Sequence, residues 1–351
     1  MKKNTKECFL ALDIGTEAVK ALVFEKDNQA YSILGSALQY FDELKPFNND
    51  KVIFQAGEEA IKESRESPKY LLASLPPNLL RNKVDLRVII RESPKEEISK
   101  KEEQDILGRV FEETKKAISH SPKDLQFINL EILGIKIDGY EVPGLKGYSG
   151  EKAEFKILAS FLPKEQFDNF NKVLSSFDLK SLKIVNPINN LGGIAGINNG
   201  VFIDIGGRFT NICVMRNGKI EMVEGFEMGG RDFSRVFSQN LGMLEGEARM
   251  FKEKYSLGEL AEQTRDKIKE MLASSVQEWQ SQFGLKLKNL KGSLPYDFFL
   301  FGGGSLLPGL MEGTGAAKVK IIYPQDIKNI IDNTHRVNSP QYINSILLIH
   351  G

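Results

Sequence analysis

The chain has 351 residues, more than one ordinary hydrophobic core accommodates, so we expect two or more compact units. Its 47 basic and 47 acidic side chains balance, which leaves no net charge to attract nucleic acid, and no nucleic-acid partner is expected. Hydrophobic residues make up 41% of the chain, as in globular proteins, but no run approaches the roughly 20 apolar residues of a membrane span.

The first part of the chain predicts one α/β unit at residues 1–80. Its apolar runs and turn residues predict elements in this order: strands at 9–12, 19–24 and 31–38, a helix at 55–65 and a strand at 70–75. Pro76 and Pro77 then end the pattern, because proline cannot donate to a strand ladder. We expect the chain to leave this unit there.

A smaller unit is predicted at residues 81–162. Residues 84–90 alternate as a strand does, and Ser99 with Glu102 forms a capping-box pattern before an apolar helical stripe. Two long strands are predicted after this helix, at 130–137 and 152–161. Strand, helix, strand and strand in this order indicate a small α+β insertion.

The rest of the chain is predicted to return to the first unit and then to repeat its plan. Residues 163–199 would rejoin that unit through a helix at 164–176, a strand at 181–185 and a helix at 189–197. Residues 200–351 open with strand, turn, strand, turn and strand, which indicates an internal duplication. The longest helix is predicted at 256–283, with Trp279 in the core, inside a helical subdomain at roughly 235–295.

Three glycine-bearing turns follow apolar runs at distant points, namely Leu12 to Thr16, Ile203 to Gly207 and Phe301 to Ser305. Each alone is a common turn between elements. Together, two Asp-x-Gly turns and a Gly-Gly-Gly-Ser turn fit a nucleotide site with two phosphate loops and an adenosine loop. Glycine suits this use because it lets backbone N–H groups approach phosphate closely.

The chemistry predicted for this site is the binding of ATP with Mg²⁺. Asp13 and Asp204 would hold the Mg²⁺ chiefly through its waters, because this ion loses water reluctantly. Lys20 could reach a β- or γ-phosphate as a point charge, or could be an ordinary strand lysine. Ser305 would cap a helix that follows the adenosine loop.

These motifs resemble those of the actin-like ATPases, and among them the bacterial FtsA and PilM families. The matching segments are Ala11–Thr16, Phe202–Asn211, Met228–Gly230 and Phe301–Leu310. The insertion, with Ile137–Tyr140 and Gly144–Gly150, looks like the SHS2-type subdomain called 1C. The resemblance implies a two-lobed α/β fold of duplicated ribonuclease-H-like domains, with subdomains 1A (1–80 and 163–199), 1C (81–162), and 2A and 2B (200–351).

The resemblance also implies which residues contact the cofactor. The expected set is Asp13, Gly15, Thr16, Lys20, Asp204, Gly206, Gly207, Thr210, Gly230, Lys252, Gly302, Gly303, Gly304 and Ser305. The chain departs from the family pattern where Arg208 and Phe209 replace a glycine and a hydroxyl, and where Arg249 replaces an acid that contacts the nucleoside. Asn186 stands where an acid often does, so ATP hydrolysis is expected to be slow or absent.

The expected role is that of an FtsA-like cytoskeletal protein of cell division, which forms filaments or links a ring of the tubulin homologue FtsZ to the inner membrane. The alternative is a PilM-like cytoplasmic component of type IV pilus assembly with a PilN-type membrane partner. The chain reaches Gly351 without the amphipathic helix usual in FtsA, which favours that alternative. A scaffold with a permanently bound nucleotide, and a sugar or acetate kinase, are further alternatives. Cys8 and Cys213, in strand-like runs, suit a reducing cytoplasm, and the resemblance implies a location at the inner face of the cell membrane.

Overall fold

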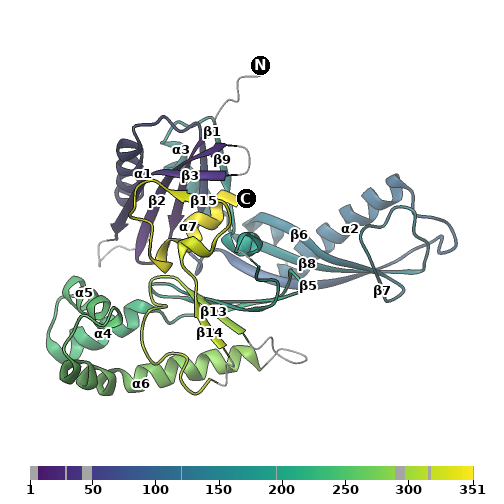
Figure 1. Cartoon of the computed structure of the whole chain (residues 1–351). Coiled ribbons are helices and arrows are strands. Elements are labelled where there is room, and N and C mark those ends of the chain that lie inside the picture. The colour runs from purple at the N-terminus through teal and green to yellow at the C-terminus, as the bar shows by residue number, and fades with distance from the viewer. Residues whose placement is uncertain are drawn as a thin grey trace.

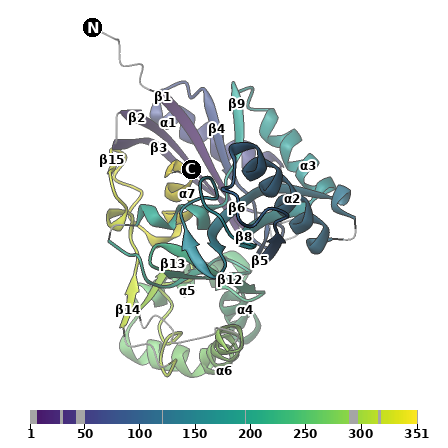
Figure 2. The same cartoon turned by 90° about the vertical axis from the view of Figure 1, so that its right-hand side faces the viewer.

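The computed structural model describes residues 7–27, 30–41, 50–119, 121–194, 196–288, 297–314 and 318–350, so Gly351 lies outside the described residues. Two lobes, each built on its own sheet, lie one above the other, and an elongated unit projects sideways from between them (Figure 1). The view turned by 90° places α6 at the far end of the second lobe from the first sheet (Figure 2).

The first lobe is built on a six-stranded sheet in the order β15-β3-β2-β1-β4-β9. Its strands are β1 (Glu7–Ile14), β2 (Ala18–Asp27), β3 (Ala30–Tyr40), β4 (Tyr70–Ser74), β9 (Ser181–Ile184) and β15 (Ile330–Asp332). Leu10 and Leu12 of β1 are fully buried, in a cluster with Val52 and Ala56 of α1 (Asp50–Ser64) and Leu174 of α3 (Lys164–Ser175). This packing explains why β1 is almost continuously apolar.

The second lobe repeats the strand plan of the first in a five-stranded sheet, β12-β11-β10-β13-β14. Its strands are β10 (Gly200–Ile205), β11 (Thr210–Arg216), β12 (Lys219–Phe226), β13 (Asp297–Phe301) and β14 (Lys318–Ile321). In both sheets three antiparallel strands come first, and the first of them pairs in parallel with the fourth. The duplication predicted from the sequence is therefore present in the two sheets.

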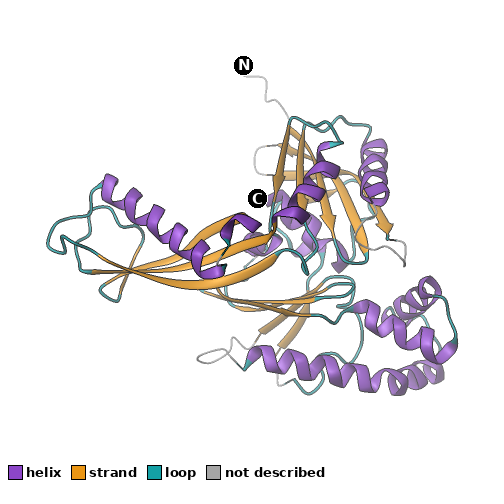
Figure 3. Cartoon of the chain, turned by 180° about the vertical axis from the view of Figure 1, so that it is seen from behind, coloured by secondary structure: helices purple, strands orange, loops and turns teal. Residues whose placement is uncertain are grey.

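The projecting unit is an antiparallel sheet, β5-β8-β6-β7, with one helix on one face (Figure 3). Its elements are β5 (Arg81–Ile90), α2 (Lys100–Ile118), β6 (Leu125–Ile137), β7 (Tyr140–Val142) and β8 (Lys152–Pro163). Ser99 caps α2 by accepting a hydrogen bond from the Glu102 N–H at 3.1 Å, as predicted. The Glu102 carboxylate does not complete the capping box and binds the buried Arg91 instead, at 2.8 Å.

Two predicted helices differ from the observed ones. The helix predicted at 256–283 is α6 (Glu262–Leu287), which begins later than predicted because α5 (Glu245–Ser256) ends just before Gly258, whose φ is +73°. The predicted helix at 189–197 is a 3₁₀ helix, Pro187–Gly193. Helices α4 (Gly230–Leu241), α5 and α6 pack on the second sheet. Trp279 of α6 is fully buried in the core that they form with it, as predicted.

The end of the chain returns to the first lobe. Strand β15 pairs in parallel with β3, and α7 (Ile343–Leu347) packs against β1 and β2. The division that placed all of residues 200–351 in the second lobe is therefore wrong for this last segment. A three-residue strand carries too little local signal to reveal its partner sheet. Across the helices that the structure describes, none is long and apolar enough to cross a membrane.

Candidate nucleotide site between the lobes

The two Asp-x-Gly turns have the same backbone geometry. The N–H of Gly15 donates to the Ala18 carbonyl at 3.0 Å, and the N–H of Gly206 donates to the Phe209 carbonyl at 2.9 Å. In each hairpin four residues therefore lie between the last cross-strand pair, 15–18 between Ile14 and Val19 and 206–209 between Ile205 and Thr210. Both turns lie on the cleft between the lobes, where they face one another.

The cross-strand neighbours of the two aspartates are also equivalent. Asp13 lies opposite Lys20 in the first hairpin, and Asp204 lies opposite Asn211 in the second. Lys20 Nζ is 3.3 Å from Asp13 Oδ2, and Ser74 Oγ donates to the other oxygen of Asp13 at 2.7 Å. Lys20 is thus an ion-pair partner in the cleft and not an exposed strand lysine.

Asp204 is partly buried, and its hydrogen-bond donors among the described residues are side-chain amides. The side-chain amides of Asn344 and Asn211 donate to its Oδ2 at 2.9 and 3.4 Å. Burial, together with the nearby charge of Asp13, raises the pKa of Asp204 to about 6. Two facing carboxylates beside the single ammonium of Lys20 are a suitable place for a hard divalent cation.

A cation here would not have a complete ligand set from protein side chains. Within the described ranges, no group of three or more histidine, cysteine, aspartate or glutamate side chains could hold a metal ion. Asp13 and Asp204 alone fit Mg²⁺, which keeps most of its waters and takes one or two carboxylates together with phosphate oxygens.

The third glycine turn, residues 302–305, packs directly on the second Asp-x-Gly turn, residues 206–209. Gly302 has φ +86°, and a Cβ added there would lie 2.4 Å from Asp204 Oδ1. The N–H of Gly304 donates to the Ile205 carbonyl at 2.8 Å, and a Cβ on Gly304 would lie 2.5 Å from Ile205 Cγ2. Only glycine permits this contact, which fixes the third turn at the edge of the cleft.

Gly303 differs from its neighbours because its Cβ direction is open, with only the Gln341 side chain within 4 Å. The Ser305 hydroxyl is buried and donates to the Gly302 carbonyl at 2.8 Å. The helix predicted to begin at Ser305 is absent, because residues 303–306 and 308–313 form consecutive turns instead. Ser305 therefore stabilises the glycine turn from behind.

Lys252 lies at the junction of α4, α5 and the second Asp-x-Gly turn. Its ammonium donates to the Gly230 carbonyl at 2.8 Å, and the Gly230 N–H donates to the Gly206 carbonyl at 2.8 Å. Burial lowers the pKa of Lys252, and the nearby carboxylates of Glu17 and Glu253 oppose this shift. Through Gly230, Lys252 thus links helix α5 to the second Asp-x-Gly turn.

Most of the residues predicted from the sequence lie together around one cavity. Those that line it are Asp13, Gly15, Thr16, Lys20, Asp204, Gly206, Gly207, Gly230, Lys252, Gly302, Gly303 and Gly304. Thr210 does not, because its buried hydroxyl donates to the Met228 carbonyl at 2.7 Å and accepts from Trp279 Nε1 at 3.0 Å. Sequence reasoning did not identify five further polar side chains that line it, Glu17, Tyr40, Glu253, Gln341 and Asn344.

The lobes touch across this cleft. The Arg208 N–H donates to Thr16 Oγ1 at 2.9 Å, and a Cβ on Gly207 would lie 2.4 Å from Glu17 Cβ. The free volume of the cavity is about 80 Å³. Sites for drug-sized ligands occupy roughly 300–1,000 Å³, so a whole nucleotide needs the lobes to move apart.

A second set of contacts closes the cleft at its outer edge. The Arg249 guanidinium on α5 lies 3.4 Å from the centre of the Tyr40 ring at the end of β3. The Tyr40 hydroxyl lies 3.4 Å from Glu253 Oε1. Burial raises the pKa of Tyr40, so its hydroxyl stays protonated and can donate to Glu253. Residues of the two lobes thus meet beside the glycine turns.

Asn186 does not provide a base for hydrolysis. Its amide nitrogen donates to Asn82 Oδ1 at 2.6 Å and to Ser160 Oγ at 2.9 Å, and its oxygen accepts from the Ile188 N–H at 3.3 Å. These bonds join the insertion to the first lobe. An asparagine so engaged cannot remove a proton from water.

Solved structures with similar folds identify the class of protein. A chain of a PilM–PilN type IV pilus biogenesis complex matches this chain with a TM-score of 0.72 at 17% sequence identity. The match covers 97% of this chain and 96% of the matched chain. The ethanolamine utilization protein EutJ from Carboxydothermus hydrogenoformans matches 98% of this chain and 89% of its own, with a TM-score of 0.53 at 14% identity. The chain thus has the two-lobed actin-like ATPase fold.

Among curated proteins, cell division protein FtsA of Streptococcus pneumoniae serotype 2 (strain D39) is similar to this chain. The two are 24% identical over 91% of this chain and 76% of the relative. A scan against protein-family models finds no match. The resemblance to the FtsA and PilM branch of actin-like proteins is confirmed by these similarities.

Proposed function

We propose that this chain binds ATP with Mg²⁺ between its lobes and acts as an FtsA-like cytoskeletal protein of bacterial cell division. The observation that supports nucleotide binding is the pair of equivalent turns, each with an aspartate at its base, facing one another across one cleft. Similarity to FtsA along most of the chain supports the cellular role. Fold alone would not, since one fold serves many functions.

The phosphates would lie between the turns 15–18 and 206–209. The backbone N–H groups of these turns that do not close the turns themselves would donate to phosphate oxygens, as would the Thr16 hydroxyl. Lys20 would contribute positive charge. Asp13 and Asp204 would hold the waters of Mg²⁺, which neutralises phosphate charge when it is bound. The nucleoside would lie against Gly303 and Lys252. Thr210 and Ser305 would support these contacts from the protein interior.

We propose that ATP controls the conformation of the protein and that hydrolysis is slow or absent. Asn186 supports this proposal, because it occupies the position where the family often has an acid. Its amide is hydrogen-bonded to Asn82 and Ser160 and cannot act as a base. ATP would hold the lobes in a filament-forming or partner-binding arrangement. Rapid transfer of phosphate to a sugar or to acetate would contradict this proposal and would favour a kinase.

Calorimetry with Mg²⁺ and ATP tests the nucleotide site. Gly303→Trp fills open space in the cleft, and we expect it to abolish micromolar binding, because its side chain would occupy the nucleoside position. Gly108→Trp is the matched control, since Gly108 is exposed on α2 and an added Cβ meets nothing within 4 Å. Absence of ATP binding by the wild type, or equal binding by Gly303→Trp, would refute the proposal.

The partner distinguishes the two cellular roles. For an FtsA-like protein we expect binding to an FtsZ-like tubulin homologue, ATP-dependent filaments and a location at the inner face of the membrane. The fold match to PilM, nearly complete on both chains, favours a second candidate, a pilus-assembly component with a PilN-type membrane partner. Pull-downs with the FtsZ homologue and the PilN homologue of the same cell decide between them.

A further inference from the structure

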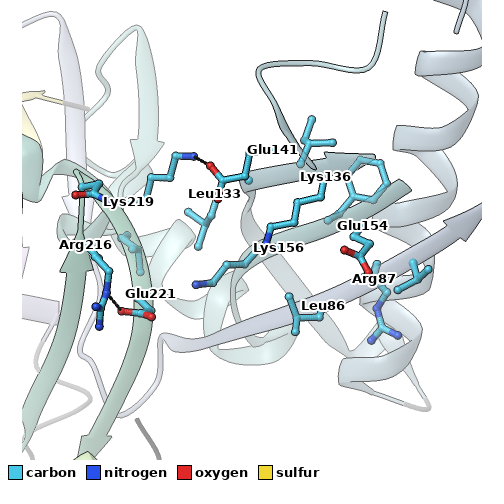
Figure 4. A pocket seen from close by; sticks show the side chains of 16 residues that line it. Leu86, Arg87, Leu133, Lys136, Glu141, Glu154, Lys156, Arg216, Lys219 and Glu221 are labelled. Atoms are coloured by element: carbon cyan, nitrogen blue, oxygen red, sulfur yellow. Dashed lines mark hydrogen bonds and ion pairs between the residues drawn. The ribbon is translucent and has the colours of Figure 1, made fainter. Parts of the chain in front are cut away.

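A groove far from the nucleotide site separates the insertion from the second lobe. It has a volume of about 530 Å³ and lies between the face of the insertion sheet that α2 leaves open and the β11–β12 hairpin (Figure 4). Phe155 and Ile157 of β8 are buried toward α2, so the alternate residues Glu154 and Lys156 face the groove. The groove is thus a continuation of the open sheet face.

One wall of the groove is apolar and exposed. Leu86, Val88 and Ile90 are 70%, 47% and 57% exposed and alternate along β5, so they form one row on the open face. This row is about 13 Å long at the usual rise of a strand. Leu133 of β6 extends toward the hairpin from the opposite side (Figure 4). Exposed apolar rows of this kind are typical of binding surfaces.

Most charged groups at the rim of the groove are already paired. Lys219 of the hairpin lies 3.5 Å from Glu141 of β7, and Arg216 lies 2.9 Å from Glu221. Glu154 pairs with Lys152 on the same strand. These pairs connect the rim and leave no excess of negative charge there.

Two lysines on the floor have no such partner. Lys136 of β6 and Lys156 of β8 make no ion pair with any residue that the structure describes, and Figure 4 shows both between the apolar wall and the hairpin. Lys156 is the direct cross-strand neighbour of Leu86. Burial lowers the pKa of Lys156, and the nearby charge of Glu221 opposes this shift. Lys136 lies cross-strand from Glu141 and Glu154, but five basic and only three acidic side chains line the groove. The groove therefore combines apolar surface with an excess of positive charge.

We propose that this groove binds an extended segment of a partner protein that presents apolar and acidic side chains together on the side facing the groove. Apolar side chains would cover Leu86 and Val88, and carboxylates would pair with Lys136 and Lys156. A strand-like segment matches the length of the row on β5, whereas a small anion would leave that row exposed. The proposal is independent of nucleotide binding, because no residue of the groove lines the interlobe cavity.

Gly134 on the floor of the groove provides a direct test. A Cβ added at this position meets nothing within 4 Å, and its backbone is not left-handed, so Gly134→Trp would fill the groove without strain in the fold. Gly108→Trp on α2 is again the control, since it adds the same side chain on the other side of the insertion. Equal melting temperatures of both variants and the wild type would establish that the fold is intact.

The experiment selects a phage-displayed library of random twelve-residue peptides on the full chain, with the Gly134→Trp variant as counter-selection. We expect the enriched peptides to contain both apolar and acidic residues, spaced two apart so that they share one face of a strand. Their binding, measured by fluorescence anisotropy, should fall at least tenfold in Gly134→Trp and in Lys136→Glu with Lys156→Glu, and should be unchanged in Gly108→Trp. It should also weaken as salt is raised.

Three results would overturn the proposal. The first is no enrichment over the counter-selection, and the second is enrichment of basic or purely apolar peptides. The third is a concentration-dependent dimer in sedimentation that Gly134→Trp abolishes, because the groove would then bind a second copy of the chain.

Discussion

At the scale of residues, single side chains determine which charges the cleft between the lobes presents. Glu17 is the clearest case, because its side chain lies against Gly207 on the second phosphate turn. A carboxylate at this place repels phosphate oxygens. The sequence shows Glu17 beside the first glycine turn, but only the fold shows that it faces the second.

We predict that Glu17→Ser strengthens ATP binding about tenfold, or ~1.4 kcal/mol, because it removes a like charge from the phosphate site. Calorimetry in Mg²⁺ measures the affinity. Glu7→Ser, at the exposed start of β1, should leave it unchanged. Equal affinities of wild type and Glu17→Ser would show that the carboxylate moves away when nucleotide binds.

Asp204 should make stability depend on pH. Its pKa in the folded state, about 6, lies above the ordinary value, so the folded protein holds a proton that the unfolded chain has lost. This contribution to stability is complete below about pH 4 and is lost as the pH rises through about 6. Without Mg²⁺, we expect Asp204→Asn to be more stable than the wild type at pH 8, by at most about 3 kcal/mol.

Urea denaturation of both proteins at pH 4 and pH 8 measures this difference. The gap should be larger at pH 8, and Mg²⁺ with ATP should reduce it by stabilising the wild type alone. A gap that is the same at both pH values would mean that Asp204 titrates normally.

At the scale of elements, buried polar contacts hold the phosphate turns to the helices behind them. Thr210 shows this best, because its one hydroxyl binds both the β12–α4 connection and the indole of Trp279 on α6. The family pattern places a nucleotide contact at this position, but here the hydroxyl belongs to the core. Its backbone position was clear from the sequence, whereas its direction depends on the sheet register.

We predict that Thr210→Val destabilises the protein by about 2–3 kcal/mol, because it leaves a buried N–H and a buried carbonyl without partners. The ATP affinity of the folded variant should stay within about twofold. Thr210→Ser keeps the hydroxyl and should lose less stability. A large loss of affinity at unchanged stability would instead make Thr210 a nucleotide contact.

At the scale of the whole molecule, a shared apolar cluster joins the lobes behind the cleft, and a few contacts close the cleft at its outer edge. Tyr40 brings β3 of the first lobe against Arg249 and Glu253 on α5 of the second. Because the closed cavity is too small for a nucleotide, these contacts must break before ATP enters.

We predict that Tyr40→Ala opens the cleft, with a larger radius of gyration in solution scattering and ATP association several-fold faster. Tyr40→Phe keeps the ring over Arg249 and should behave nearly as the wild type does. Should both variants match the wild type in both measurements, Tyr40 would not control closure.

The sequence by itself determined the duplicated strands, the insertion, the three glycine turns and the two facing aspartates. These features are local, since apolar period and turn chemistry depend on residues close together in the chain. Only the tertiary structure decided that β15 returns to the first lobe, that Thr210 faces a core, and that Glu17 and Tyr40 meet the second lobe. These outcomes depend on pairing and packing between distant segments, which local patterns do not specify.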